Sequence, residues 1–291
     1  MPSSADFDSL QDILRLEPIE VNLFRGISPD DGYPRIFGGL VIAQALLAAY
    51  ETVPADRVCH SLHCYFIRPG DVTAPVLYQV DRARDGGSFT TRRVTAIQHG
   101  QQIFNFAASF QAAEDGPEHQ FDAPEAPDAD SLPTEAELLK GLGEHLPPQV
   151  MKVTDRPWRI EVRWVDPPTL VDPGPKPARK EVWMRAKEPV PDDVRLQQAT
   201  LAYASDLTFM ETALRVHGLN FWTPGLQPAS LDHAIWFHRP VDFNDWVLFA
   251  QDSPSTSESR GLVRGEMFRR DGTLVASMAQ EALMRVRKPK S

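Results

Sequence analysis

A five-residue pattern that occurs twice constrains the fold more than any other feature of the chain. The first copy reads Tyr65-Phe66-Ile67-Arg68-Pro69, and the second reads Trp236-Phe237-His238-Arg239-Pro240. Each copy is followed by a glycine turn and an apolar stretch, at His99-Gly100 and at Asp271-Gly272. The spacing between the copies is kept to within one residue. Because internal repeats change the domain count, this pattern predicts a duplicated unit within the 291 residues.

Each predicted unit contains one helix that precedes its strands. Residues 38–49 are apolar on nearly all sides, which is typical of a buried helix. The second helix is predicted over residues 196–204, where Asp192 and Asp193 are candidates for the N-cap or the first turn.

Runs of β-forming residues between turns predict antiparallel strands. Residues 160–165 alternate apolar and polar side chains with a period of two, and further strands are predicted at 182–185, 247–250 and 262–268. Both glycine turns are typical of hairpins. The predicted fold class is therefore α+β, with one buried helix against an antiparallel sheet in each unit. If the two sheets pair edge to edge, each unit also covers the exposed strand of the other.

The predicted domain boundaries follow from a change in composition. Residues 1–111 form the first unit and residues 151–291 form the second. The connection over residues 112–150 is acidic and rich in proline, with few groups able to enter a core. A short helix is predicted within it, over residues 134–142.

Composition excludes several classes of protein. Thirty basic and forty acidic residues give a net charge of −10, which argues against a nucleic-acid partner but allows an anionic small molecule held by local arginines. No run approaches the ~20 apolar residues that span a bilayer, so no stable membrane insertion is expected. The start of the chain lacks the features of a secretory signal, and two cysteines cannot supply a disulfide framework. The expected location is cytoplasmic.

Common catalytic motifs are absent from the sequence. There is no Gly-x-Ser-x-Gly elbow, no Gly-x-Gly-x-x-Gly and no phosphate-binding Gly-x-x-x-x-Gly-Lys-[Ser/Thr]. The sequence therefore predicts no cofactor.

The segment from Cys59 to Cys64 superficially resembles a metal cluster, because it reads Cys-His-Ser-Leu-His-Cys. On a strand, side chains alternate, so Cys59 and His63 would face one side while His60 and Cys64 face the other. Four ligands cannot converge from that arrangement. We interpret the segment as buried strand residues, and no metal site is predicted.

Three polar residues of the second unit form the candidate catalytic set. Asp206 directly follows the second helix, Ser230 opens a strand and Gln280 closes one. Taken singly, each is an ordinary cap, turn or strand residue. A carboxylate, a hydroxyl and an amide can nevertheless hold one water and take a proton from it without a covalent intermediate. His233 and His238 fit better as structural or ligand-lining residues, since no elbow serine or cysteine accompanies them.

Several longer motifs occur in order from about Leu14 to Arg285. In the second half they are residues 201–207, 230–240 and 260–265 and the pair Gln280-Glu281; in the first half they are Phe37-Gly38-Gly39, His60-Ser61, residues 66–71, Gly87-Ser88-Phe89 and Arg92-Arg93-Val94. Together they make the chain resemble the acyl-CoA thioesterase II (TesB-like) family.

The resemblance implies a double hotdog fold, in which two antiparallel sheets, each wrapped around a long central helix, are joined in one chain. It implies hydrolysis of acyl-CoA thioesters to free fatty acid and CoA, with the water held by Asp206, Ser230 and Gln280. Relatives often carry threonine at position 230; serine keeps the hydroxyl but loses the methyl group that restricts its rotamer. A homo-oligomer, dimer or tetramer, is also implied.

The first unit is expected to be non-catalytic, because Ala48-Ala49-Tyr50 stands after its helix where the second unit has an aspartate.

An anionic acyl-CoA needs further contacts. Backbone amides near the helix start at Gly39 are candidates for an oxyanion hole, and the CoA phosphates need cations. The candidate substrate-binding and CoA-binding positions are Gly39, His60, Arg68, Ser88, Arg92, Arg93, His233, Arg260 and Arg264. No sequence pattern selects among the arginines.

Two alternative functions stay open at this stage. A hotdog-fold enoyl-CoA hydratase or dehydratase would make His233 or His60 essential. A non-catalytic acyl-CoA-binding protein would bind its ligand without turnover.

Overall fold

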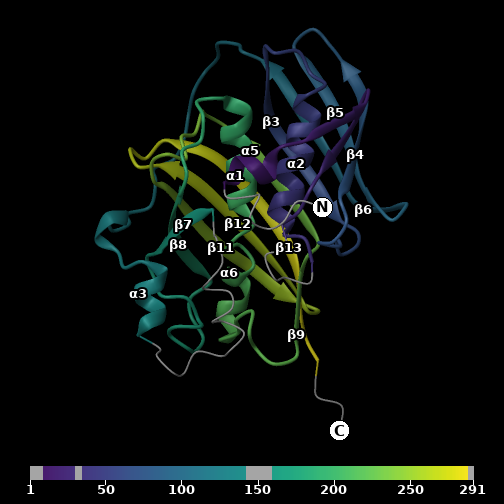
Figure 1. Ribbon diagram of the computed structural model, residues 1–291. Helices are drawn as coiled ribbons and strands as arrows, with labels where there is room; N and C mark the ends of the chain where they lie inside the picture. The colour runs from purple at the N-terminus through teal and green to yellow at the C-terminus, as the bar shows by residue number, and fades with distance from the viewer. Residues whose placement is uncertain (1–8, 30–34, 142–158, 288–291) are drawn as a thin grey trace.

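Strands dominate both halves of the chain in the computed structural model, which describes residues 9–29, 35–141 and 159–287 (Figure 1). The strands of the first half are β1 (Glu17–Glu20), β2 (Leu23–Gly26), β3 (Arg57–Phe66), β4 (Val76–Asp85), β5 (Phe89–Gln98) and β6 (Gln101–Ala112). Those of the second half are β7 (Ile160–Trp164), β8 (Arg179–Ala186), β9 (Leu226–Ser230), β10 (Asp232–Phe237), β11 (Val247–Ser257), β12 (Arg260–Arg269) and β13 (Leu274–Val286). The helices are α1 (Leu10–Leu14), α2 (Gly38–Tyr50), α3 (Glu135–Lys140), α5 (Val194–Ser205) and α6 (Glu211–Leu214), with 3-10 turns η2 (Ala129–Ser131) and η4 (Arg215–His217). The helices and strands predicted in the two units are confirmed, with boundaries that differ by up to three residues except in β11, which continues to Ser257 instead of ending at residue 250.

One continuous antiparallel sheet joins the two halves. Its order among the described residues is β1-β2-β4-β5-β6-β3-β10-β13-β12-β11-β8-β7, with β9 paired to β13. The two predicted sheets pair edge to edge through β3 and β10, the arrangement considered from the sequence, and so form one continuous sheet. This pairing removes an exposed edge from each half.

The register of β3 against β10 follows the repeat. His63 is the cross-strand partner of Ala234, and these residues are 171 positions apart, as are Tyr65 and Trp236. When two equivalent residues of a repeat face each other, the axis that relates the copies passes between them. The predicted duplication is therefore visible in the strand pairing.

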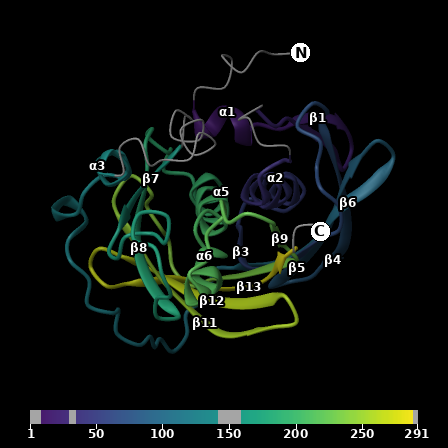
Figure 2. The ribbon, with the colours of Figure 1, turned by 90° about the horizontal axis from the view of Figure 1, so that it is seen from below.

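The two long helices lie side by side on the concave side of the curved sheet (Figure 2). They run in opposite directions, since Tyr50 at the end of α2 donates a hydrogen bond of 2.5 Å to Gln198 near the start of α5. Helix α2 is buried on nearly all sides, as predicted, and its Gln44 amide donates to the Ile13 and Ile27 carbonyls. Asp193 caps α5 by accepting from the Arg195 amide, which confirms one of the two predicted caps.

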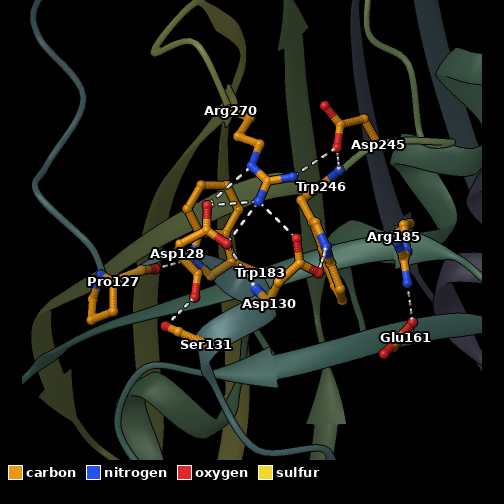
Figure 3. Close-up of polar contacts among 10 residues, drawn as sticks. All are labelled: Pro127, Asp128, Asp130, Ser131, Glu161, Trp183, Arg185, Asp245, Trp246 and Arg270. Carbon is orange, nitrogen blue, oxygen red and sulfur yellow. Dashed lines mark hydrogen bonds and ion pairs between the residues drawn. The ribbon is translucent and has the colours of Figure 1, made fainter.

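Residues 120–132 of the connection lie along the outer face of the second half (Figure 2). Figure 3 shows how it is attached: Trp183 donates to the Pro127 carbonyl at 2.8 Å, and Arg270 forms ion pairs with Asp128 at 2.6 Å and Asp130 at 2.7 Å. Ala129 is buried in this contact. The sequence analysis predicted that few side chains of the connection enter a core. It overlooked Trp183 and Arg270, because both partners lie in the second half of the chain. The predicted short helix is present as α3, and residue 142 lies outside the described residues.

A β-bulge changes which residues of β3 face the core. The register shifts between Cys59 and Ser61, and Cys59 and Cys64 are both buried while His63 is exposed. The predicted strict alternation across Cys59–Cys64 is therefore wrong, because the bulge inserts one extra residue.

None of the helices among the described residues is long and apolar enough to cross a membrane.

Candidate active site

Asp206 lies where the end of α5 meets the start of α2. It is the C-cap residue of α5, and its carboxyl group receives a hydrogen bond from the Gly39 backbone amide. A Cβ atom on Gly38 would lie 2.5 Å from Asp206 Oδ2, and one on Gly39 would lie 2.4 Å from the Tyr203 carbonyl oxygen. The Gly38-Gly39 pair therefore allows two helix ends to approach closely enough to enclose a carboxyl group. The Gly39 amide, a predicted oxyanion donor, here donates to Asp206.

The surroundings of Asp206 raise its pKa to about 7, because burial penalises the carboxylate. Hydrogen bonds from Ser230, Gln280 and the Gly39 amide act in the opposite direction and lower the pKa. Although protein atoms surround the carboxyl group, the residue keeps part of its surface accessible to solvent. A carboxyl group with this pKa can act as a general base near neutral pH.

Ser230 and Gln280 reach Asp206 through the pairing of β9 with β13. Ser230 is the last residue of β9 and lies opposite Ala282, two positions from Gln280 on the same face of β13. Its Oγ donates to Asp206 Oδ1 at 3.2 Å and accepts from Gln280 Nε2 at 3.0 Å. The structure thus brings the three predicted catalytic residues together. Ser230 ends a strand rather than opening one, and Gln280 lies within its strand rather than closing it.

His233 contacts the Gln280 side chain on the side opposite to Ser230. Its Nδ1 is 2.5 Å from Gln280 Oε1, and its Nε2 is 3.0 Å from Ser205 Oγ. The imidazole is buried beside the Phe209 ring, and burial lowers its pKa to about 4. Both ring nitrogens are therefore used within the protein, and the ring is neutral at physiological pH.

The structure places His60 and Ser88, two further predicted contacts, in the first half. His60 Nε2 is 2.8 Å from Ser109 Oγ, and partial burial lowers the pKa of the imidazole. Ser88 is exposed in the turn between β4 and β5, where its carbonyl accepts from the Ala112 amide at 3.0 Å.

The predicted arginines have different surroundings. Arg92 is buried with 1% of its surface exposed, and it donates to Thr52 Oγ1 and carbonyl and to Asp85. Arg93 is exposed on the other face of β5. The remaining three make contacts at the surface: Arg68 with the Gln102 carbonyl, Arg260 with Glu258 and Glu281, and Arg264 with Asp252. The Arg92 guanidinium is thus engaged inside the first half, whereas the other four are at least partly exposed.

The first half has apolar residues where the second has this polar cluster. The β3–β10 pairing relates residues that are 171 positions apart, so Leu62 in the first half is equivalent to His233 in the second. The pairings of β6 and β13 with their neighbours place Ala108 at the position of Gln280. An acid does cap α2, one residue beyond the predicted Ala48-Ala49-Tyr50, but the Glu51 side chain is 54% exposed. Glu51 is therefore neither buried like Asp206 nor surrounded by an equivalent of the polar cluster.

Two cavities lie on opposite faces of the sheet. A cavity of about 20 Å³ borders the start of α2 and is lined by Phe37, Leu40 and Tyr203. A larger one of about 240 Å³ lies on the outer face, between Phe121 of the connection and Phe268 of β12. Of these two cavities, the smaller one is beside the Gly38-Gly39 pair that encloses Asp206.

The chain is similar to known proteins along nearly its whole length. Residues 153–283 match the family model described as acyl-CoA thioesterase, and residues 29–111 match acyl-CoA thioesterase N-terminal domain. Acyl-CoA thioesterase 2 of Haemophilus influenzae is 39% identical over 96% of this chain and 97% of its own length. Acyl-coenzyme A thioesterase 8 of Homo sapiens is also 39% identical, over 94% of this chain and 88% of its own. The crystal structure of acyl-CoA thioesterase II TesB2 from Mycobacterium marinum has a TM-score of 0.76 at 40% identity and covers 95% of this chain and 98% of that chain.

Proposed function

This chain belongs to the acyl-CoA thioesterase family, and from that premise we propose that Asp206, Ser230 and Gln280 bind and activate the water that hydrolyses the thioester. The chain is an enzyme, an acyl-CoA thioesterase with a hotdog fold. The observation that supports the residue assignment is the hydrogen-bonded cluster of these three side chains around a carboxyl group whose pKa is near 7.

The proposed reaction has two steps. Asp206 takes a proton from the bound water as the water oxygen attacks the thioester carbonyl carbon, while Ser230 and Gln280 hold the water and stabilise the developing oxyanion. The carbon–sulfur bond then breaks, and the proton on Asp206 goes to the departing thiolate. The products are a fatty acid and CoA, and no covalent acyl-enzyme is formed.

The second half supplies this chemistry in our proposal, and the first half supports it. We divide the chain into an N-terminal hotdog unit over 1–111, a connection over 112–150 and a catalytic hotdog unit over 151–291. Each unit has its own central helix, α2 or α5, and the two units share the continuous sheet. The first unit contributes the Gly38-Gly39 helix start that encloses Asp206.

Contacts with CoA are the remaining part of the proposal. The exposed or partly exposed Arg68, Arg93, Arg260 and Arg264 remain the predicted phosphate ligands, whereas the burial of Arg92 favours a structural role. The homo-oligomeric state and the cytoplasmic location also remain predictions.

Thiol release from a panel of saturated acyl-CoA substrates tests the residue assignment. Asp206→Asn should lower kcat by on the order of 10²- to 10⁴-fold with an unchanged circular dichroism spectrum, because the general base is lost. Ser230→Thr should retain activity, and Ser230→Ala should lose part of it. Hydrolysis at the wild-type rate by Asp206→Asn would exclude Asp206 as the base, and equal rates for Ser230→Ala and wild type would exclude a role for the hydroxyl.

A further inference from the structure

The hydrogen bonds around Asp206 continue beyond the three proposed catalytic residues. They run from Ser205 Oγ to His233 Nε2, from His233 Nδ1 to Gln280 Oε1, from Gln280 Nε2 to Ser230 Oγ, and from Ser230 Oγ to Asp206 Oδ1; we call these five residues the relay. Ser205 and Asp206 are adjacent in sequence, so the relay leaves the end of α5 and returns to it through β10, β13 and β9.

The direction of each hydrogen bond follows from the chemistry of the side chains. Gln280 donates to Ser230 through Nε2, so its carbonyl Oε1 faces His233. An amide oxygen only accepts hydrogen bonds, and the imidazole must therefore carry its proton on Nδ1. In the neutral ring Nε2 is then an acceptor. The Ser205 hydroxyl lies 3.0 Å from Nε2 and 2.9 Å from the Ala202 carbonyl, and its one proton serves the relay when it is donated to Nε2. From His233 onward, every donor in the relay consequently points toward the Asp206 carboxylate.

The neutral state of His233 is maintained by its surroundings. Burial lowers the pKa of its imidazole to about 4, so the ring does not titrate near neutral pH. The nearby Cys64 thiol donates to the His233 carbonyl, and burial raises its pKa, so that thiol is neutral as well. Asp232, the next residue on β10, accepts from the Glu281 amide through its carboxylate at 2.7 Å. Of the two ionisable side chains in the relay, His233 and Asp206, only Asp206 therefore titrates near neutral pH.

The first half provides an internal comparison. At the positions of His233 and Gln280 it has Leu62 and Ala108, both of them buried. The histidine and the glutamine are thus present together in the half that has the buried aspartate and absent together from the other half. In the first half a leucine fills the position equivalent to His233, since Leu62 on β3 is buried with 0% of its surface exposed.

We propose that His233, held by Ser205, is a positioning residue that fixes the orientation of the Gln280 amide, so that its NH₂ group rather than its oxygen faces Ser230 and Asp206. The inference rests on the proposed function, because it assigns His233 a purpose only if Gln280 serves the catalytic water. Without His233 the amide can rotate by half a turn, and its oxygen would then face the Ser230 hydroxyl and the Asp206 carboxylate. One donor to the water site would be lost, and the hydrogen bond that lowers the Asp206 pKa would be lost with it.

The test compares three substitutions of His233 by kcat, KM and the pH dependence of kcat/KM with a medium-chain acyl-CoA. His233→Leu should lower kcat by about 10-fold, the loss expected when an orienting partner is removed, with KM changed much less. The acid limb of its kcat/KM profile, where activity falls with falling pH, should move to higher pH, because the Asp206 carboxylate has lost a hydrogen-bond donor. His233→Asn should restore most of the rate and the wild-type limb, since its amide NH₂ can replace Nδ1–H. His233→Gln, which extends toward Ser205 instead, should behave like His233→Leu.

A double-substitution cycle and Ser205→Ala complete the test. In a Gln280→Ala background, His233→Leu should have no further effect, because the amide that it orients is gone. Ser205→Ala should change kcat and the acid limb in the same direction as His233→Leu, by a smaller factor, and it is also the check if the leucine variant fails to fold. A wild-type kcat and limb in a folded His233→Leu, or full additivity with Gln280→Ala, would overturn the proposal.

Asp206→Asn separates this proposal from the one on which it rests. If Asp206→Asn is inactive and His233→Leu is like wild type, only the positioning role fails. If Asp206→Asn retains activity, the catalytic assignment fails independently of His233.

Discussion

A side chain on Gly38 would collide with the carboxyl group of Asp206: its Cβ would lie 2.5 Å from Oδ2. These residues belong to different halves of the chain and are brought together by the antiparallel packing of α2 and α5. The half without the polar cluster therefore contributes directly to the shape of the candidate site. It supplies a helix start, free of side-chain bulk, against which the carboxyl group is held.

Gly38→Ala should lower kcat by up to about 100-fold, because a displacement of Asp206 by about 1 Å is enough to misplace the water. Gly116→Ala is the matched control, since a Cβ at Gly116 meets nothing within 4 Å. Initial rates of thiol release for the two variants measure the effect. Equal activity of Gly38→Ala and Gly116→Ala would show that the close approach is not needed for catalysis.

The pH dependence of kcat/KM should show an acid limb near pH 7, because the base must be deprotonated and burial raises the pKa of Asp206 to about 7. The Ser230 hydrogen bond lowers that pKa. Ser230→Ala should therefore move the limb to higher pH, and Ser230→Thr should leave it in place. If the limb stays at the same pH in Ser230→Ala, the Ser230 hydroxyl does not influence the pKa of the group that titrates.

Asp206→Asn should stabilise the folded protein at pH 8. A carboxyl group with a raised pKa in the folded state binds its proton more tightly there than in the unfolded chain, so it costs stability above its ordinary pKa of 3.8. This cost grows as the pH rises to about 7 and is constant above it. A rise from 3.8 to about 7 corresponds to a few kcal/mol, so we expect Tm at pH 8 to rise by several degrees, at roughly 2–4 °C per kcal/mol in a large domain. The difference should disappear toward pH 4, and a lower Tm for the variant at pH 8 would contradict this account.

Arg270→Gln should lower Tm slightly and leave kcat unchanged. Arg270 attaches the connection through Asp128 and Asp130 and also pairs with Asp245 of its own half, but these groups are solvent-exposed and solvent screens them (Figure 3). The arginine lowers the pKa of Asp128 and Asp130, so its contribution should be present at neutral pH and be lost as the pH falls through those lowered values. Arg25→Gln, which removes an exposed arginine with a single partner, Glu17, is the control. A lowered kcat in Arg270→Gln would connect this outer face to the active site.

The parts of the structure that depend on local sequence could be predicted, and the parts that depend on distant partners could not. The repeat around Phe66 and Phe237 predicted two related halves, and apolar periodicity predicted α2, because these signals are contained within short segments. The β-bulge at Cys59 has no such signal. The attachment of Asp128 depends on Arg270, which is 142 residues further along the chain.

The candidate site shows the same division. Asp206, Ser230 and Gln280 were found because together they form a recognisable chemical set in a chain that resembles a known family. The roles of Gly38, Ser205 and His233 depend on which side chains they meet in space. Only the helix crossing and the strand pairing reveal those contacts.

Single-turnover hydrolysis in H₂¹⁸O tests the central claim most directly, with wild-type enzyme in excess over an acyl-CoA substrate. If Asp206 activates a water that attacks the thioester, every fatty acid released in the first turnover should carry one ¹⁸O atom, and the enzyme should carry none. If the carboxylate attacked the thioester and water then attacked the Asp206 carbonyl of the resulting anhydride, the first-turnover fatty acid would be unlabelled, and mass spectrometry would find one ¹⁸O atom in the peptide that contains Asp206.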